Sequence, residues 1–203
     1  MEYVVLGLGS NKSYKGDSCI ELLQKACTML AEVLTNICIT SVYKTGAMYV
    51  VDQDDFYNMA VGGFFEGTPT QLLNKIHIIE GNLGRNRALE FRNGPRSMDI
   101  DIEIFGNRKI KDNNLVIPHE RLFERSFVLT PLLEIFDSNA DVNFNESKEI
   151  YLPEINADKT FCKSFCQLRL EELNDQKIVL CVTKDDFEAD LEKKFGKVFS
   201  RGV

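Results

Sequence analysis

The feature that most constrains the fold is a run in which apolar and acidic residues alternate. In residues 94–106, GPRSMDIDIEIFG, every second position from Asp99 through Asp101 to Glu103 is acidic, and the positions between them are isoleucine. A period of two predicts a β-strand with one apolar and one acidic face. Acidic residues are poor strand formers and like charges on one face repel each other, so the pattern costs stability unless something offsets it. Two interpretations are open: an edge strand whose acidic face is solvated, or a face that binds divalent cations.

An arginine-rich loop, residues 84–96, lies directly before this strand. Its only acid is Glu90, and its arginines are Arg85, Arg87, Arg92 and Arg96. Carboxylates that hold Mg²⁺ beside guanidinium groups that bind phosphate are what a magnesium polyphosphate requires. Two metal ions about 3.5–4 Å apart could share the aspartates of the strand. The alternative is a surface loop whose arginines pair with the acids.

The predicted elements before residue 106 follow the order βαββαβ. Strands are predicted at 2–9, 37–45, 56–67 (with Gly62 and Gly63 as a bulge or bend) and 98–105, and helices from Asp17 or Ser18 to Leu34 and from Thr68–Pro69 to Leu83. This order predicts an α+β fold of the ferredoxin-like type, with an open, mostly antiparallel sheet and helices on its faces.

The pattern weakens after a helical segment predicted at 120–136. We expect a helix at 161–173, a strand at 177–183 and an amphipathic helix at 185–199. The chain is therefore divided into a core domain, residues 1–136, and an α/β C-terminal extension of unknown role, residues 137–203, packed on the core.

Composition excludes several classes of function. The net charge of −7 over 203 residues argues against a nucleic-acid ligand, and no apolar run is long enough to span a bilayer. The chain start lacks a basic leader, and the six cysteines form no CxxC pair, so we expect buried free thiols and a cytoplasmic monomer. There is no GxxxxGK[ST] loop and no HRD or DFG set, which excludes P-loop and protein kinases.

The segment GPRSMDIDIEIFG closely resembles the GPR-[ST]-x-D-x-D-I-x-x-[FY]-G signature of the 6-hydroxymethyl-7,8-dihydropterin pyrophosphokinases of folate biosynthesis. Three further blocks agree with this family in order and spacing: LGLGSN, VYKT followed by DFYNMAV, and IPHERLFERSFVLTPLLEI. The resemblance covers about residues 3–136.

The resemblance implies transfer of a pyrophosphoryl group from ATP to the hydroxymethyl group of the pterin, leaving AMP. It implies that two Mg²⁺ ions bind Asp99 and Asp101. The implied pterin-site residues are Thr45, Phe56, Asn58, Asp99 and Phe127. The implied phosphate-clamping and catalytic residues are Arg85, Arg92 and Arg96, and the implied nucleotide-binding residues are Glu80, Arg85, Arg96, Ile102, His119 and Arg125.

Two alternatives come from other functional classes. A metal-dependent nucleotidyltransferase of the polymerase-β type also pairs Gly-Ser with a strand Asp-x-Asp, but there the two lie roughly a dozen residues apart, whereas here Gly9-Ser10 precedes Asp99 by about ninety. A non-catalytic ferredoxin-like regulatory module would explain the fold but neither the arginines nor the acidic strand.

Overall fold

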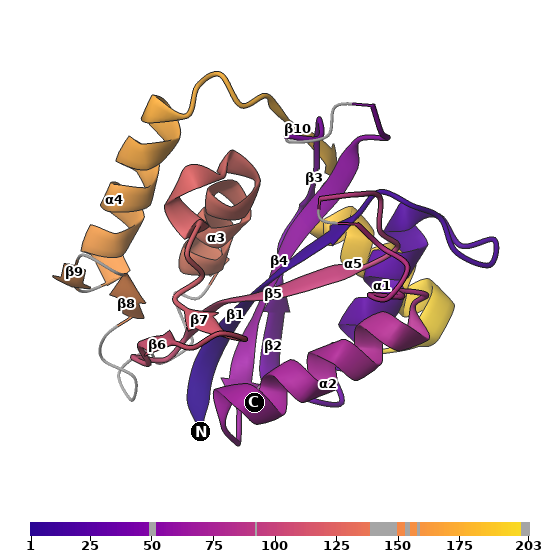
Figure 1. Ribbon diagram of the computed structural model, residues 1–203, viewed down its shortest axis with the longest axis horizontal. Helices are drawn as coiled ribbons and strands as arrows, with labels where there is room; N and C mark the ends of the chain where they lie inside the picture. The colour runs from indigo at the N-terminus through magenta and orange to yellow at the C-terminus, as the bar shows by residue number, and fades with distance from the viewer. Residues whose placement is uncertain (49–51, 92, 139–149, 153–154, 158, 200–203) are drawn as a thin grey trace.

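An antiparallel six-stranded sheet forms the middle layer of the computed structural model (Figure 1). The structure describes residues 1–48, 52–91, 93–138, 150–152, 155–157 and 159–199. The strands run in the spatial order β10-β3-β4-β1-β5, and β2 also pairs with β4. Their bounds are β1 (Glu2–Ser10), β2 (Thr35–Ile39), β3 (Val42–Thr45), β4 (Phe56–Phe65), β5 (Asp99–Phe105) and β10 (Ile178–Val182).

Helices cover both faces of the sheet (Figure 1). One face carries α1 (Cys19–Leu30), α2 (Pro69–Asn82) and α5 (Lys184–Phe195), and the other carries α3 (Ser126–Ser138) and α4 (Lys159–Glu172), with the short 3-10 helix η1 (Leu122–Glu124) before α3. Two hairpins complete the described chain: β6 (Ile110–Lys111) with β7 (Val116–Ile117), and β8 (Ile150–Leu152) with β9 (Ile155–Ala157). The predicted ferredoxin-like α+β class is confirmed.

The first two helices begin where side chains replace missing backbone partners. The side chains of Ser18 and Thr68 each accept a hydrogen bond from the backbone N–H of the third helical residue. The side chains of those third residues, Glu21 and Gln71, accept a hydrogen bond from the backbone N–H of the capping residue. Such capping boxes satisfy two otherwise unpaired donors at a helix start. Ser18 rather than Asp17 is therefore the N-cap of α1.

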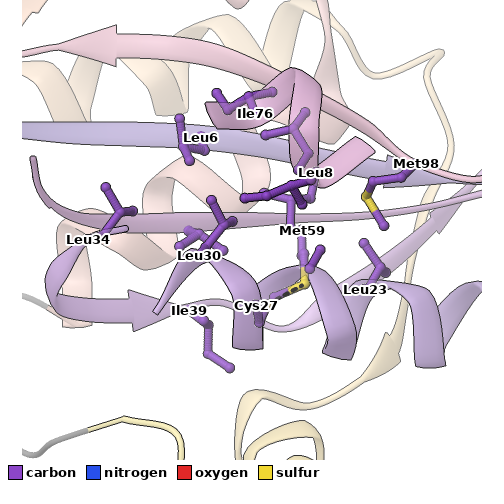
Figure 2. Close-up of a cluster of buried hydrophobic side chains, with 14 of the residues drawn as sticks. Leu6, Leu8, Leu23, Cys27, Leu30, Leu34, Ile39, Met59, Ile76 and Met98 are labelled. Carbon is purple, nitrogen blue, oxygen red and sulfur yellow. Dashed lines mark hydrogen bonds between the residues drawn. The ribbon is translucent and has the colours of Figure 1, made fainter. Parts of the chain in front are cut away.

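The main core lies between the sheet and the α1–α2 layer. Figure 2 shows Leu23 and Leu30 of α1 packed against Leu8 of β1 and Met59 of β4. Alternate residues of each strand point to the other face, where Val5 of β1 and Ala60 of β4 meet α3. The period of two thus sorts β5 as well: its isoleucines Ile100 and Ile102 enter the core, and its acids face the α3 side.

The segment predicted as one strand at 37–45 is two strands, so that prediction is wrong in detail. From the pair Ile39↔Val61 to the pair Tyr43↔Asn58, this segment advances four residues while β4 advances three. Thr40 accepts a hydrogen bond from the Ala60 amide through its hydroxyl, which takes the place of a ladder bond. The extra residue is a β-bulge that ends β2 and re-aims β3.

The bulge or bend predicted at Gly62 and Gly63 is absent on the β1 side, where β4 pairs without a register shift; on the β2 side a register shift lies opposite Gly63, with the extra residue in β2 between Thr35 and Cys38. These glycines serve close packing. A Cβ at Gly62 would lie 2.2 Å from the Tyr3 hydroxyl, and one at Gly63 would lie 3.1 Å from the Leu34 side chain.

The cysteine prediction holds only in part. All described cysteines are free, but only Cys27 and Cys166 are buried; Cys19 and Cys38 are half-buried, and Cys181 on edge strand β10 is exposed. The side chain of Cys162 lies outside the described residues. None of the helices among the described residues is long and apolar enough to cross a membrane.

Candidate active site

The acidic face of β5 opens into a cavity of about 290 Å³ between the sheet and the start of α3. The cavity is lined by side chains from four regions that are far apart in sequence. These are Thr45, Phe56 and Asn58 from β3–β4, Arg85 and Arg96 from the arginine-rich loop, Asp99, Asp101 and Glu103 from β5, and His119, Arg121, Arg125 and Phe127 before and at the start of α3.

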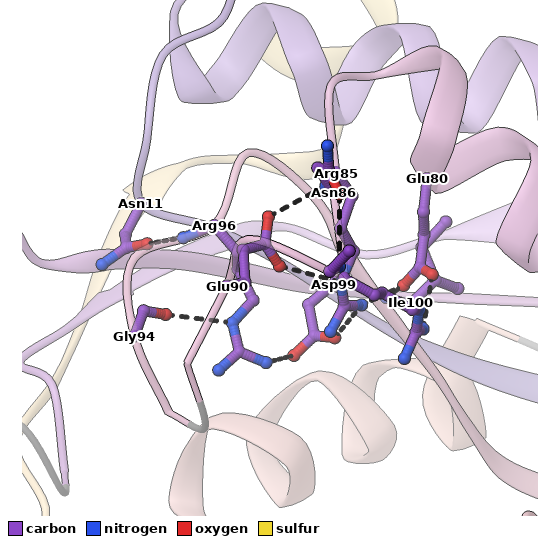
Figure 3. A network of polar contacts seen from close by, with 11 residues as sticks. Asn11, Glu80, Arg85, Asn86, Glu90, Gly94, Arg96, Asp99 and Ile100 are labelled. Carbon is purple, nitrogen blue, oxygen red and sulfur yellow. Dashed lines mark hydrogen bonds and ion pairs between the residues drawn. The ribbon is translucent and has the colours of Figure 1, made fainter.

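The end of β1 fixes the arginine-rich loop at its junction with β5. The Ser10 hydroxyl donates to the Ser97 carbonyl at 2.6 Å, and the Asn11 side-chain oxygen accepts from the Arg96 amide at 2.8 Å. The backbone N–H of Asn11 in turn donates to the Arg96 carbonyl at 3.1 Å. The backbone of Arg96 is therefore held by the Gly-Ser-Asn turn, independently of its side chain (Figure 3).

The described arginines of this loop, Arg85, Arg87 and Arg96, all pair with carboxylates, and Figure 3 shows the pairs of Arg85 and Arg96. Arg96 binds Asp99 at 2.7 Å, Arg85 bridges Asp99 and Glu80, and Arg87 binds Glu80 at 2.6 Å. Arg85 and Glu80 are only 9% and 1% exposed, so these pairs are not those of a solvated surface loop. Buried, hydrogen-bonded Arg–carboxylate pairs set side-chain orientation strongly. The structure thus aims Arg85 and Arg96 at the acidic strand.

Of Asp99 and Asp101, Asp101 has the charge that is less compensated by neighbouring cations, because Asp99 forms the ion pairs with Arg85 and Arg96. Loss of hydration, and then the neighbouring charge of Asp99, raise the pKa of Asp101 to about 7. A carboxylate held in this way is stabilised by an added cation. The described residues contain no group of three or more acidic, His or Cys side chains that could enclose a metal ion, so an ion here would complete its coordination with water or substrate oxygens.

Glu103 is the third acid of the strand and was not predicted as a site residue. Its side chain is 2% exposed, and its Oε2 has no hydrogen-bond partner in the described part of the chain. Burial, and then the charge of Asp101, raise its pKa well above 4.5. Gly7 makes room for it, since a Cβ at that position would lie 2.8 Å from Glu103 Oε1. The alternation of acids in the sequence was the signal that could have identified it.

His119 lies beside Glu103, with 3.8 Å between its Nδ1 and Glu103 Oε2. Burial, and then the charge of Arg125, lower the pKa of His119 to about 4, so the ring is neutral at pH 7. Its Nδ1 accepts from the Arg121 amide at 3.2 Å. The proton therefore sits on Nε2, which leaves that nitrogen as a neutral donor.

Replacing Glu103 with glutamine is expected to stabilise the protein at alkaline pH only. The native state keeps the Glu103 proton to higher pH than the unfolded chain does, so this group lowers stability as pH rises above 4.5. Glutamine imitates the protonated acid and removes that loss, about 1–3 kcal/mol for one uncompensated buried group. Thermal unfolding without divalent cations, near pH 5 and near pH 8, measures it. The exposed Asp112→Asn variant is the control, and equal shifts of Glu103→Gln at both pH values would contradict the prediction.

Across β1 from the acids, where Asn58 and Asp99 pair with Gly9 from opposite sides, the cavity is lined by aromatic rings and an amide. The Asn58 side chain donates to Thr45 Oγ1 at 2.9 Å, and both residues are buried. Phe56 begins β4, and Phe127 lies at the start of α3 with the guanidinium of Arg125 5.5 Å from its ring centre. This end presents flat apolar surfaces and a polar edge.

The structure does not bring every predicted residue into the cavity. Ile102 points to the other face of the sheet and packs in the core, and Glu80 lies behind Arg85, where it also accepts the Ile100 amide at 2.9 Å. Arg92 lies outside the described residues. Arg121 and Gln53 line the cavity although neither was predicted; Arg121 is the arginine of the Pro-His-x-Arg block, so its signal was present.

Comparisons with known proteins agree on one family. Residues 5–137 match the family model of 7,8-dihydro-6-hydroxymethylpterin-pyrophosphokinase (HPPK). The 2-amino-4-hydroxy-6-hydroxymethyldihydropteridine pyrophosphokinase of Bacillus subtilis is 38% identical over 135 residues, covering 66% of this chain and 76% of that protein. The mitochondrial folate synthesis bifunctional protein of Arabidopsis thaliana is 38% identical over 141 residues, covering 68% of this chain and 24% of its own length.

The chain thus spans about a quarter of the length of the bifunctional plant relatives it matches. Among solved structures, an HPPK-DHPS from Plasmodium falciparum superposes with a TM-score of 0.54 at 16% identity, covering 86% of this chain and 47% of that one. At this identity the likeness supports the fold alone.

Proposed function

The chain belongs to the 7,8-dihydro-6-hydroxymethylpterin-pyrophosphokinase family, and on that premise we propose that it transfers the terminal pyrophosphoryl group of ATP to the hydroxymethyl group of a reduced pterin, releasing AMP. One observation carries the proposal. A single cavity has an aromatic, amide-lined end and an end where arginines face carboxylates. The first suits a flat heterocycle and the second a metal-bound polyphosphate.

The aromatic end supplies the pterin site in this proposal. Phe56 and Phe127 would stack on the two faces of the ring, because aromatic side chains bind flat π-systems with an energy beyond that of buried area. Asn58, oriented by Thr45, would hydrogen-bond the polar edge of the pterin.

The carboxylate end fits magnesium with ATP. Asp99 and Asp101 offer hard oxygen donors on one strand face, and Mg²⁺ is commonly bound by one or two carboxylates together with substrate phosphates. The pKa of Asp101, raised first by burial and then by the charge of Asp99, is consistent with a carboxylate that a bound cation would stabilise. When bound, the ions would neutralise phosphate charge and polarise the phosphorus under attack. We propose two ions, held by Asp99 and Asp101.

The side chains of this protein then position the transfer. The pterin hydroxyl attacks the β-phosphorus and releases its proton to water, and the bond from that phosphorus to the α,β-bridging oxygen breaks, so that AMP leaves with the bridging oxygen. Arg85 and Arg96 can exchange Asp99 for phosphate oxygens, and neutral His119 can donate through Nε2. Catalysis in such a site is mainly alignment and charge stabilisation.

Replacing Phe127 with alanine is expected to weaken pterin binding about tenfold or more while leaving MgATP binding nearly unchanged. The ring lines the cavity but is only half-buried, so its loss removes a stacking surface worth about 0.5–1.5 kcal/mol beyond its buried area. Calorimetric titration of each ligand measures the two effects. Phe123→Ala, which removes a ring packed on Phe165 of α4, is the control. Equal losses of affinity for pterin and for MgATP would show that Phe127 has a purely structural role.

The proposed reaction is tested by the appearance of AMP. The protein is incubated with ATP, Mg²⁺ and 6-hydroxymethyl-7,8-dihydropterin, and nucleotides are separated by anion exchange. AMP that forms only when all three are present supports the proposal. A nucleotidyltransferase would instead release pyrophosphate, and a regulatory module would release neither product.

We further propose a monomer that acts in the cytoplasm on small molecules and not on nucleic acid. The net charge of −7 disfavours a polyanionic polymer, and both ends of the cavity are built from one chain. The described cysteines are free thiols, which suits a reducing compartment.

A further inference from the structure

We propose that the C-terminal extension completes the pterin site, with Gln176 as a positioning residue that fixes the wall carrying Phe127 relative to the wall carrying Thr45. The inference rests on the proposed function, since it assigns the site a pterin. It gives a role to residues that lie beyond the family match, which ends at residue 137.

The Gln176 side chain forms hydrogen bonds with the backbone at the start of α3. Its Oε1 accepts from the Ser126 amide at 2.8 Å, and its Nε2 donates to the Glu124 carbonyl at 2.9 Å. The Gln176 carbonyl also accepts from the Ser126 hydroxyl at 3.4 Å. The first amides of a helix have no partner within the helix, so Gln176 satisfies one of them and acts as a cap supplied by a distant segment.

The segment bound by Gln176, from Glu124 to Ser126, contains one residue of the cavity and directly precedes another. Arg125 and Phe127 both line the cavity, and the two backbone groups bound by Gln176 flank Arg125 on either side. Arg169 of α4 adds a bond to the Phe123 carbonyl at 3.1 Å. The direction in which Phe127 leaves the helix start therefore depends on the extension.

The same segment continues directly into the opposite wall. Two residues after Gln176, Ile178 begins β10 and pairs with Thr45 at the end of β3, as the chain passing from α4 to the sheet edge shows (Figure 1). Two residues span at most about 7 Å. The short connection from Gln176 to Ile178 therefore limits the distance between the wall that carries Phe127 and the wall that carries Thr45.

A second set of contacts holds the C-terminal half of α3, whereas Gln176 holds the start of this helix. Glu134 accepts from the Ser41 amide at 2.9 Å and from the Tyr43 hydroxyl, which joins the second half of α3 to the start of β3. A ring stacked between Phe56 and Phe127 requires a fixed gap, because stacking weakens steeply with separation. Loss of the Gln176 contacts would loosen the end of α3 that carries Phe127.

The test compares Gln176→Ala with Gln71→Ala. Gln71 donates no contact to the cavity and accepts from the Thr68 amide at 2.8 Å in the capping box of α2, so its loss removes a helix-start bond of the same kind elsewhere. Both variants are expected to lower the unfolding temperature, Gln176→Ala by the larger amount because it removes two side-chain hydrogen bonds where Gln71→Ala removes one. Only Gln176→Ala is expected to weaken binding of 6-hydroxymethyl-7,8-dihydropterin, by about tenfold, since it removes two hydrogen bonds at the site wall.

Three further readouts make the outcome decisive. The MgATP affinity of Gln176→Ala should fall less than its pterin affinity, because Arg85 and Arg96 are held by contacts that do not involve Gln176. Amide exchange at the start of α3 should accelerate. Gln176→Glu, which keeps the acceptor for Ser126 but sets a carboxylate against the Glu124 carbonyl, should bind pterin less well than wild type.

Two results would overturn the inference, and they differ. If wild type binds pterin and Gln176→Ala binds it equally well, or loses pterin and MgATP affinity in the same proportion, the positioning role is wrong while the proposed function stands. If wild type binds no pterin, the proposed function fails and the inference fails with it.

Discussion

Replacing Asp101 with asparagine is expected to reduce pyrophosphoryl transfer about a thousandfold without unfolding the protein. The amide keeps the shape of the side chain but loses the charge that would hold a cation, and metal-ion stabilisation of a transferring phosphoryl group supplies several kcal/mol, at about 1.4 kcal/mol per tenfold in rate. Stability should not fall, because the pKa of Asp101 is raised to about 7 by burial and by Asp99. The native state holds this proton to higher pH than the unfolded chain, so this group lowers stability as pH rises above 3.8, and the loss reaches its full size above about pH 7.

Asp101 is a sharper target than Asp99. Asp99 binds both Arg85 and Arg96, so its removal leaves two guanidinium groups without that partner and mixes catalytic and structural effects. Turnover at saturating Mg²⁺ and thermal unfolding at pH 8 are compared with the exposed Asp112→Asn variant. Near-normal turnover of Asp101→Asn would refute the metal site.

Replacing Arg96 with alanine is expected to lower turnover about a hundredfold to a thousandfold, with a smaller loss of MgATP affinity. An arginine that stabilises the charge of a transferring phosphoryl group contributes on this scale or above it. The loop should keep its position, because Asn11 binds the backbone of Arg96 and the side chain contributes only its bonds to Asp99 and the Gly94 carbonyl.

The matched control is Arg108→Ala. Arg108 forms an exposed pair with Glu2 away from the cavity, and such surface pairs contribute little. Arg96→Lys should recover only part of the activity, since an ammonium cannot make the bidentate contact of a guanidinium. Equal turnover of Arg96→Ala and Arg108→Ala would show that Arg96 takes no part in the transfer.

The fold was predictable where local pattern and tertiary packing agree. The alternation in β5, the capping residues Ser18 and Thr68, and the proline at the start of α2 each have a local physical cause. The break between β2 and β3 has none, because it depends on a hydrogen bond that the Ala60 amide donates to the Thr40 hydroxyl across the sheet. Only the paired strands reveal it.

The site was predictable in its residue types more than in its contacts. The cluster of arginines beside acids indicated a polyphosphate, and the structure brings Arg85, Arg96 and Asp99 together. It does not bring Glu80 or Ile102 into the cavity, since helix α2 sets Glu80 behind Arg85 and the strand period turns Ile102 into the core. Gln176 could not be identified from the sequence, because its partners lie about fifty residues away and are backbone groups.

The measurement that tests the central claim most directly follows the phosphorus atoms of ATP. The protein is supplied with Mg²⁺, 6-hydroxymethyl-7,8-dihydropterin and ATP labelled with radioactive phosphorus at either the α or the γ position, and the products are separated by chromatography. Attack at the β-phosphorus predicts that the γ label enters the pterin and that the α label is recovered in AMP. An α label in the pterin, or an α label recovered in ADP beside a γ label in the pterin, would contradict pyrophosphoryl transfer.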